Sequence, residues 1–215
     1  MTTVAVRGES TREAEPELAE FTVVITARDK DRSATLGRLR ERADALRQFL
    51  DRYDQAIERR ETGGVHVYPE SGRRGERVTA YNGSVSTTVT VTDFAALGEM
   101  MLAVAGQDQT QVHGPTWSLR PGSPVHREAR HAAVADAIAR AREYAEALGA
   151  EVVELVELSD PGLSRGAEGI VSFQAYDGGM RGKSAGVPEL ELDPQRQRVY
   201  AAVEARFTIT SPTRL

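Results

Sequence analysis

The periodicity of apolar residues changes several times along this chain of 215 residues, and the order of these changes limits the fold more than any other feature. Apolar residues two apart, which are typical of half-buried strands, occur in 4–6, 19–27, 65–67, 78–91, 116–119 and 199–209, and the apolar stretch 152–158 is also expected to be a strand. Apolar residues three or four apart, which are typical of amphipathic helices, occur in 33–57, 94–104 and 124–148. This order lacks the strict alternation of strand and helix found in parallel sheets. It therefore predicts an α+β fold, in which a largely antiparallel sheet is packed by one long and two further helices.

Glycine and proline mark several boundaries of these elements. The pair Gly63-Gly64 is expected to end the first helix, and Ser123-Pro124 has the cap and the first-turn proline that start the third. Within 78–91, Asn82-Gly83 is compatible with a tight hairpin and also with one long strand that contains a bulge. The inner face of the third helix is unusually small, which allows close approach to a sheet, and it consists of Ala129, Ala133, Ala137, Ala141 and Ala145.

Composition bounds the number of domains. With 40% hydrophobic residues, one domain spanning residues 1–215 can bury a full core. The stretch at about 159–195 is the exception, because it is rich in glycine and shows little periodicity. We expect a flexible insertion there.

Charge and residue usage exclude several classes of protein. The formal net charge is −5, and neither sign is gathered into a block, which argues against nucleic acid or an anionic membrane as the main partner. The chain has no cysteine, so disulfides, thiol nucleophiles and thiolate metal sites are excluded. No apolar stretch has the length of a signal peptide or a membrane span, which predicts no membrane insertion and, if Met1 is the true start, a cytoplasmic location.

The familiar catalytic and ligand-binding motifs fail on spacing. His126 and His131 are five apart, so on a helix they turn away from each other and do not form a metal pair. Gly182-Lys183-Ser184 is similar to the end of a phosphate-binding loop, but Asp177 stands where that loop needs a glycine. We therefore predict no catalytic residues, no metal site and no cofactor.

Weaker candidates leave alternatives open. Glu189, Glu191 and Asp193 would line one face of an extended segment and could hold a hard cation, although an acidic edge that discourages strand pairing is the favoured interpretation. Trp117 and Tyr200 could line an apolar pocket, although core or interface packing is the more common role of single aromatic residues.

Six segments in fixed order resemble the SIMPL-domain family, which includes periplasmic immunogenic proteins and oxidative-stress defence proteins. They cover nearly the whole chain and read VAVRGE with Gly8, EPELAEFTVVI with Pro16, GVHVYPE, AYNGSVSTTVTVTD with Tyr81, AVADAIARAREYAEALGAEVVELVEL and YAAVEARFTI. The resemblance implies an α+β fold, assembly into homo-oligomers and structural roles for Gly8, Pro16 and Tyr81. It also implies that 80–91 is one continuous strand, which favours the bulge over the hairpin.

The expected function is that of a non-enzymatic, self-assembling protein that serves stress tolerance or acts as a scaffold. A small-molecule or cation-binding module with a pocket under 159–195 is the alternative, and a hydrolase that uses His66 or His113 is less favoured. The last strand is long and regular, and it would expose unpaired backbone groups unless a neighbour covers them. Glu204 and Arg206 could pair with the same residues of a second copy, so the candidate interface comprises Tyr200, Glu204 and Arg206.

Overall fold

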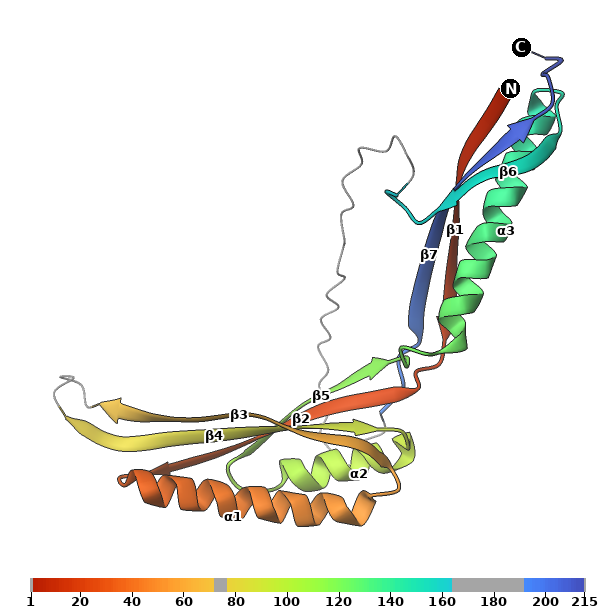
Figure 1. Cartoon of the computed structure of the whole chain (residues 1–215). Helices are drawn as coiled ribbons and strands as arrows, with labels where there is room; N and C mark the ends of the chain where they lie inside the picture. Colours follow the sequence, from red (N-terminus) through yellow and green to blue (C-terminus); the bar gives the residue numbers. More distant parts are fainter. Residues whose placement is uncertain (1, 72–76, 164–191, 215) are drawn as a thin grey trace. The chain divides into compact units, whose positions relative to one another are not determined.

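The computed structural model describes residues 2–71, 77–163 and 192–214 (Figure 1). These residues form two compact units, which we describe separately. Unit 1 takes residues 2–14, 121–163 and 197–214, and unit 2 takes the described residues between 15 and 120 together with 192–196. The order of strands and helices is the predicted one, and the α+β class is confirmed.

One domain across residues 1–215 stays a prediction. Most of the predicted flexible insertion at about 159–195 lies outside the described residues.

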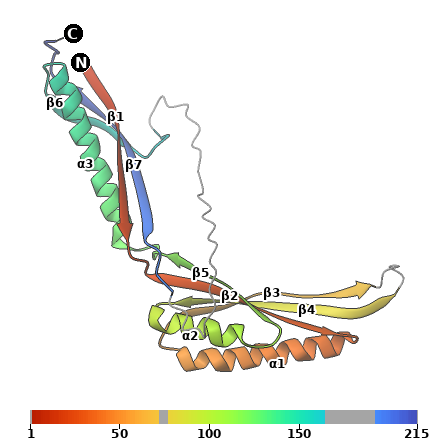
Figure 2. The same ribbon diagram turned by 180° about the vertical axis from the view of Figure 1, so that it is seen from behind.

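Unit 1 is a three-stranded antiparallel sheet with one helix on one face. Its strands lie in the order β1 (Thr2–Ala14), β7 (Gln197–Ile209) and β6 (Val152–Ser159). The helix α3 (Pro124–Ala147) lies along β1 and β7 (Figure 2). Its five inner alanines are at most 1% exposed. Three of them, Ala133, Ala137 and Ala141, pack with Val6, Val203 and Phe207.

Gly8 makes the close contact between this helix and β1 possible. A Cβ atom added to Gly8 would lie 2.5 Å from the backbone nitrogen of Ala137 and 2.7 Å from its Cβ atom. Both distances are well inside van der Waals contact, so a side chain at this position would push the helix away. The alanine face and Gly8 together set how closely α3 packs on the sheet, and the predicted close approach is confirmed.

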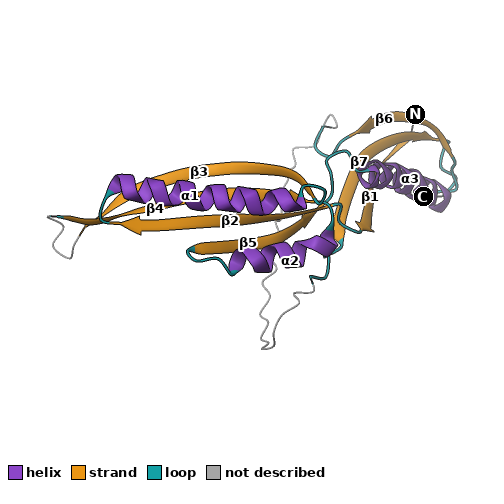
Figure 3. Cartoon of the chain, turned by 90° about the horizontal axis from the view of Figure 1, so that it is seen from below, coloured by secondary structure: helices purple, strands orange, loops and turns teal. Residues whose placement is uncertain are grey.

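Unit 2 is a four-stranded antiparallel sheet covered on one face by two helices (Figure 3). The strand order is β3 (Ile57–Ser71), β4 (Val78–Val91), β2 (Leu18–Asp29) and β5 (Thr110–Ser118). The helix α1 (Arg32–Leu50) packs on β2 and β4, and α2 (Phe94–Ala105) packs beside β5. The core lies between these layers and includes Phe21, Ile25, Leu46, Leu50, Leu97 and Met100.

The chain enters and leaves unit 2 at neighbouring positions. The backbone N–H of Glu17 donates to the carbonyl oxygen of Ser118 at 2.9 Å, at the start of β2 and the end of β5. The backbone N–H of Arg120 donates to the Glu17 carboxylate at 3.0 Å. The two ends of residues 15–120 are therefore held side by side.

The first helix is shorter than predicted. It ends at Leu50, a 3₁₀ turn η1 (Asp51–Tyr53) follows, and Ile57 already pairs with Val91 as the first residue of β3. Gly63-Gly64 therefore does not end a helix. It lies inside β3. Thr62 pairs with Thr87 and Val65 pairs with Val85, so three residues of β3 are matched by two of β4, and β3 has a bulge at this point.

The strand β4 is continuous through Asn82-Gly83, as the family resemblance implied, but it is not the bulged strand. Asn82 pairs with Arg28 and Gly83 with Ala27 without a shift of register, so the predicted bulge lies in the neighbouring β3 instead. Gly83 has a packing role. A Cβ atom there would lie 2.6 Å from Cδ1 of Leu39, so glycine lets α1 pack closely on the sheet.

Candidate functional site

The face of the unit 1 sheet that is turned away from α3, here called the outer face, carries all three residues of the predicted interface. Alternate residues of a strand point to opposite faces, and Val203 and Phe207 pack against α3. Tyr200, Glu204 and Arg206 therefore lie together on the outer face. Their strand β7 is paired on both sides, with β1 and β6, so the open-edge argument for this interface is wrong. The interface itself stays a prediction.

Tyr200 is held between two charged side chains of β1. Its hydroxyl donates to Oε1 of Glu9 at 2.8 Å and accepts from Nη2 of Arg7 at 3.2 Å. Arg7 also forms an ion pair with Glu9 at 3.0 Å. The hydrogen bond to Tyr200 is the main cause of a pKa of Arg7 above its ordinary value. This cross-strand group presents a half-exposed aromatic ring at a fixed position.

The neighbouring part of the outer face has unsatisfied polar atoms. Nε of Arg206 lies 3.9 Å from the Glu157 carboxylate, which is too far for a hydrogen bond. Among the described residues, the buried side-chain atoms without a hydrogen-bond partner are Oγ of Ser159, Nε of Arg206 and Oγ1 of Thr208. Ser159 pairs with Glu204 across the sheet, so all three belong to β6 and β7 on this face. Buried polar groups without partners are rare in native proteins, and they call for an explanation.

The strand β6 presents an unusual run of exposed apolar side chains. Within the described ranges it pairs with β7 on one side and has no partner on the other. Its pairing with β7 shifts between Val152 and Glu154 and again between Leu155 and Glu157, so Val153 and Val156 are the extra residues of two bulges. We call the following exposed residues the β6 patch: Val153 (62%), Leu155 (51%), Val156 (53%) and Leu158 (47%).

Sequence reasoning identified β6 as a strand but missed this patch. The adjacent pairs Val152-Val153 and Leu155-Val156 break the period of two, and that break was the available signal. Apolar residues on both faces of a short strand indicate either burial on both faces or a surface that binds a partner.

The residues predicted as structural family positions lie at three separate places. Gly8 contacts α3, Pro16 lies in the link between β1 and β2, and Tyr81 lies in β4 opposite Asp29. The Tyr81 carbonyl oxygen accepts a 3.4 Å hydrogen bond from the hydroxyl of Thr35 in α1.

The other chemical candidates are not brought together. His66 lies in β3 of unit 2 and His113 in β5, whereas His126 and His131 lie in α3 of unit 1. Across residues 2–71, 77–163 and 192–214, no group of three or more His, Asp or Glu side chains is placed to hold a metal ion. Gly182-Lys183-Ser184, Glu189 and Glu191 lie outside the described residues.

Trp117 has a packing role in the core of unit 2. It stacks edge-on against Phe94, with ring centroids 4.8 Å apart, and contacts the buried residues of that core. In the part of the chain that the structure describes, no helix is long and apolar enough to cross a membrane.

Comparison with known proteins gives two results. A profile of the SIMPL family, described as "Protein of unknown function (DUF541)", matches residues 4–207. The 26 kDa periplasmic immunogenic proteins of Brucella melitensis and Brucella abortus are each 33% identical over 175 residues, which is 74% of this chain and 67% of theirs. Both relatives are named as periplasmic, and this finding overturns the predicted cytoplasmic location, which is wrong.

Proposed function

Because this chain belongs to the SIMPL family, whose function is unknown, we propose a role that rests on its own surfaces: a non-enzymatic periplasmic protein that assembles with copies of itself through the β6 patch. The periplasmic part of the proposal comes from the names of the two relatives. The assembly is proposed to serve as a scaffold, with stress tolerance as its physiological setting.

The observation that carries the proposal is the exposure of four large apolar side chains on one strand of eight residues. Complete burial of an exposed side chain of this kind contributes about 1.5–3 kcal/mol, and these four are already about half buried, so covering each of them contributes about half of that. A second copy is the natural occupant, because a two-fold axis brings the same apolar surface to both sides. The two bulges disturb the backbone ladder of β6, so side chains rather than added strand pairs make the contact.

The outer face of the same two strands supports the same proposal, although Leu155 and Leu158 pair with Phe207 and Ala205 and so lie on the α3 side of β6. The unpartnered atoms of Ser159, Arg206 and Thr208 lie on β6 and on the strand paired with it, and a neighbouring chain would supply hydrogen-bond partners for them. Tyr200 and Arg206 then belong to the contact, and aromatic and arginine side chains are enriched in protein interfaces. This surface suits binding, since the β6 patch carries no group for proton or group transfer.

The mass of the protein in solution tests the proposal. Light scattering on a size-exclusion peak is expected to give a multiple of 23.4 kDa at micromolar concentrations. Val156→Lys places a charge in the patch and should shift the mass towards 23.4 kDa. Val78→Lys is the matched control, because Val78 is 44% exposed in unit 2 and should leave the mass unchanged.

A wild-type mass of 23.4 kDa across this range would overturn the proposal. So would an oligomer that Val156→Lys leaves intact, because assembly would then use another surface. The location is tested separately: osmotic shock of the native bacterium should release the protein with periplasmic markers.

A further inference from the structure

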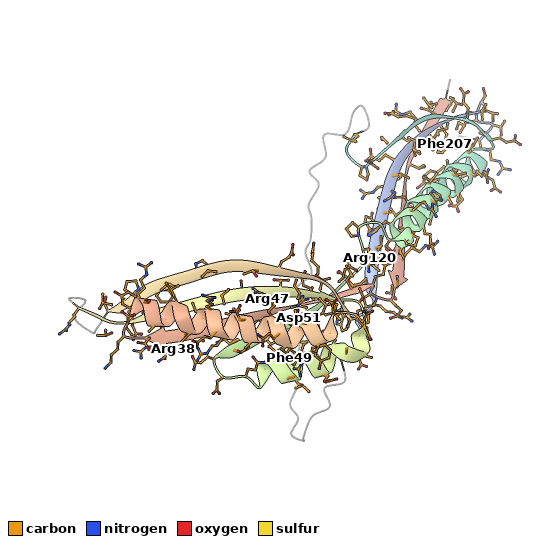
Figure 4. The ribbon with its side chains drawn as sticks, turned by 60° about the horizontal axis from the view of Figure 1, so that its bottom comes forward. Arg38, Arg47, Phe49, Asp51, Arg120 and Phe207 are labelled. Atoms are coloured by element: carbon orange, nitrogen blue, oxygen red, sulfur yellow. The ribbon has the colours of Figure 1, made fainter. Side chains whose placement is uncertain are left out.

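Unit 1 has a hollow at the end where α3 stops. Three segments surround it: the last turns of α3, the link from α3 to β6, and the residues that follow β7. Its volume is about 640 Å³, which is within the usual range of small-molecule sites. Phe207 lies in β7, three residues before the lining residue Thr210, so the hollow is at the end of unit 1 where Figure 4 labels Phe207.

Hydrogen bonds hold the wall formed by the residues after β7. The backbone N–H of Thr210 donates to the carbonyl oxygen of Glu151, and the backbone N–H of Glu151 donates to the Thr210 hydroxyl, each at 2.9 Å. Further along, the Thr213 hydroxyl donates to the carbonyl oxygen of Gly149 at 2.9 Å, and the Thr213 backbone N–H donates to that of Leu148 at 3.1 Å. The backbone around the hollow is therefore in place before a ligand binds, which lowers the cost of binding.

Three exposed charged side chains line the hollow: Arg142 and Glu146 on α3, and Glu151 on the link to β6. Within the described residues, none of the three side chains forms an ion pair or a hydrogen bond. Arg142 and Glu146 are four residues apart, but the order arginine then glutamate is the less favourable one for pairing in a helix. On the same helix, Asp136 and Arg140 have the favourable order and pair at 3.0 Å. The three charges of the hollow are thus available to a ligand.

These charges are separated by sign along the hollow. Glu146 and Glu151 lie near the C-terminal end of α3, where the helix dipole also favours cations. Arg142 is about one helical turn further from that end. Arg214 lies just beyond the wall and does not line the hollow. A ligand that carries a carboxylate at one end and cationic groups at the other therefore matches the hollow.

From this arrangement we infer that the hollow binds an α-amino acid with a cationic side chain, such as lysine. The guanidinium of Arg142 holds the α-carboxylate, because its planar fork matches a carboxylate. Glu146 and Glu151 each accept hydrogen bonds from one ammonium group of the ligand. A neutral amino acid would leave one of these glutamates without a partner, and a diamine would leave Arg142 without one.

Titration calorimetry with L-lysine at low ionic strength tests this inference, and wild-type protein should bind one lysine per chain. Norleucine, which lacks the side-chain ammonium of lysine, and cadaverine, which lacks its carboxylate, should each bind at least about fivefold more weakly. Arg142→Gln should weaken lysine binding about fivefold and leave cadaverine binding unchanged. Arg130→Gln is the matched control, because Arg130 is also exposed on α3 but does not line the hollow.

The location of the ligand is checked by chemical shifts. Lysine should perturb the methyl groups of Ala150 and Val152 and leave those of Val65 and Val85 in unit 2 unchanged. The inference is overturned by the absence of saturable binding, by equal affinity for norleucine or cadaverine, by equal effects of the two arginine variants, or by shifts confined to unit 2. Val156→Lys should bind lysine as the wild type does, because Val156 does not line the hollow, so a failure of assembly and a failure of binding are distinguishable.

Discussion

Two glycines in this chain have opposite surroundings, and they allow a matched test of packing. Gly8 lies against the backbone of α3, whereas a Cβ atom added to Gly37 in α1 would meet nothing within 4 Å. Gly8→Ala should lower the free energy of unfolding of unit 1 by about 1–3 kcal/mol, because the helix must move away from β1. Gly37→Ala should raise the stability of unit 2 by about 0.5–1 kcal/mol, since alanine loses less backbone entropy in a helix.

Urea unfolding followed by circular dichroism measures both changes. A Gly8→Ala protein as stable as the wild type would show that α3 does not need this close contact. The sign of the Gly37→Ala effect is the internal control, because it depends on helix propensity alone.

Among the residues that the structure describes, Glu70 has the pKa that its neighbours lower most clearly. Its carboxylate accepts hydrogen bonds from Arg28 at 2.7 and 3.1 Å and from Asn82 at 2.9 Å. These bonds, with those of Arg28 first, lower the pKa of Glu70 from 4.5 to about 2. The folded pKa is depressed, so the stabilisation by this carboxylate is complete above pH 4.5 and is lost as the pH falls through about 2.

A carbon NMR titration of the Glu70 carboxyl group should therefore have its midpoint near pH 2. Arg28→Gln should raise that midpoint towards 4.5, because the largest cause of the shift is removed. Arg38→Gln removes a different ion pair, with Asp29, and should leave the Glu70 titration unchanged. An unaltered midpoint in Arg28→Gln would contradict this assignment.

At the scale of an element, the alanine face of α3 makes a prediction about helix surfaces. Ala141 is fully buried against the sheet of unit 1, and Ala139, on the same helix, is exposed. Ala141→Leu adds volume where the helix and strands are in contact and should destabilise the protein by about 1–3 kcal/mol. Ala139→Leu should change stability by less than about 0.5 kcal/mol. Thermal unfolding compares the two, and equal effects would mean that the small face is not a packing requirement.

Local patterns predicted the order of the elements well and their ends less well. Tyr53 and Ile57 continue the helical spacing of 33–57, yet Ile57 belongs to β3, where it pairs with Val91. At the end of a segment, a single apolar residue is compatible with both the helical and the strand periodicity. Whether it belongs to the helix or to the strand then depends on the residue with which it pairs. Gly63-Gly64 was misread for the same reason, because a glycine pair suits a helix end and a strand bulge equally.

Pairings between distant segments could not be read from the sequence. The strand β7 pairs with β1, from the start of the chain, on one side and with β6 on the other. It is therefore a central strand, and the open edge that was expected at Glu204 and Arg206 does not occur. By contrast, the placing of Tyr200, Glu204 and Arg206 on one face could be predicted, because alternate residues of a strand lie on the same face. The β6 patch depends on bulges at Val153 and Val156. A bulge is defined by how β6 pairs with β7, and this pairing cannot be read from β6 alone.

At the scale of the whole molecule, the segment 15–120 should fold when expressed alone. It contains all four strands of the unit 2 sheet, both of its helices and nearly all of its core. Trp117 is the single tryptophan of the chain and packs in that core, so its fluorescence reports on unit 2. The fragment should lose this signal and its far-ultraviolet dichroism together in one cooperative transition.

Two separate transitions, or a gradual loss of signal on heating, would contradict independent folding. The full-length chain is the control, because its fluorescence follows the same unit in the presence of unit 1.

The hydrogen bond between Glu17 and Ser118 also bears on how this segment could be exchanged between proteins in evolution. It brings together the two ends of a long stretch of chain, so a host protein needs only two adjacent residues to receive it. A single recombination event that transfers the DNA for residues 15–120 into another gene would deliver a segment whose ends already meet. Lineages can therefore gain, lose or exchange this segment as a cassette, and the same geometry makes it a practical graft into the surface loops of unrelated proteins.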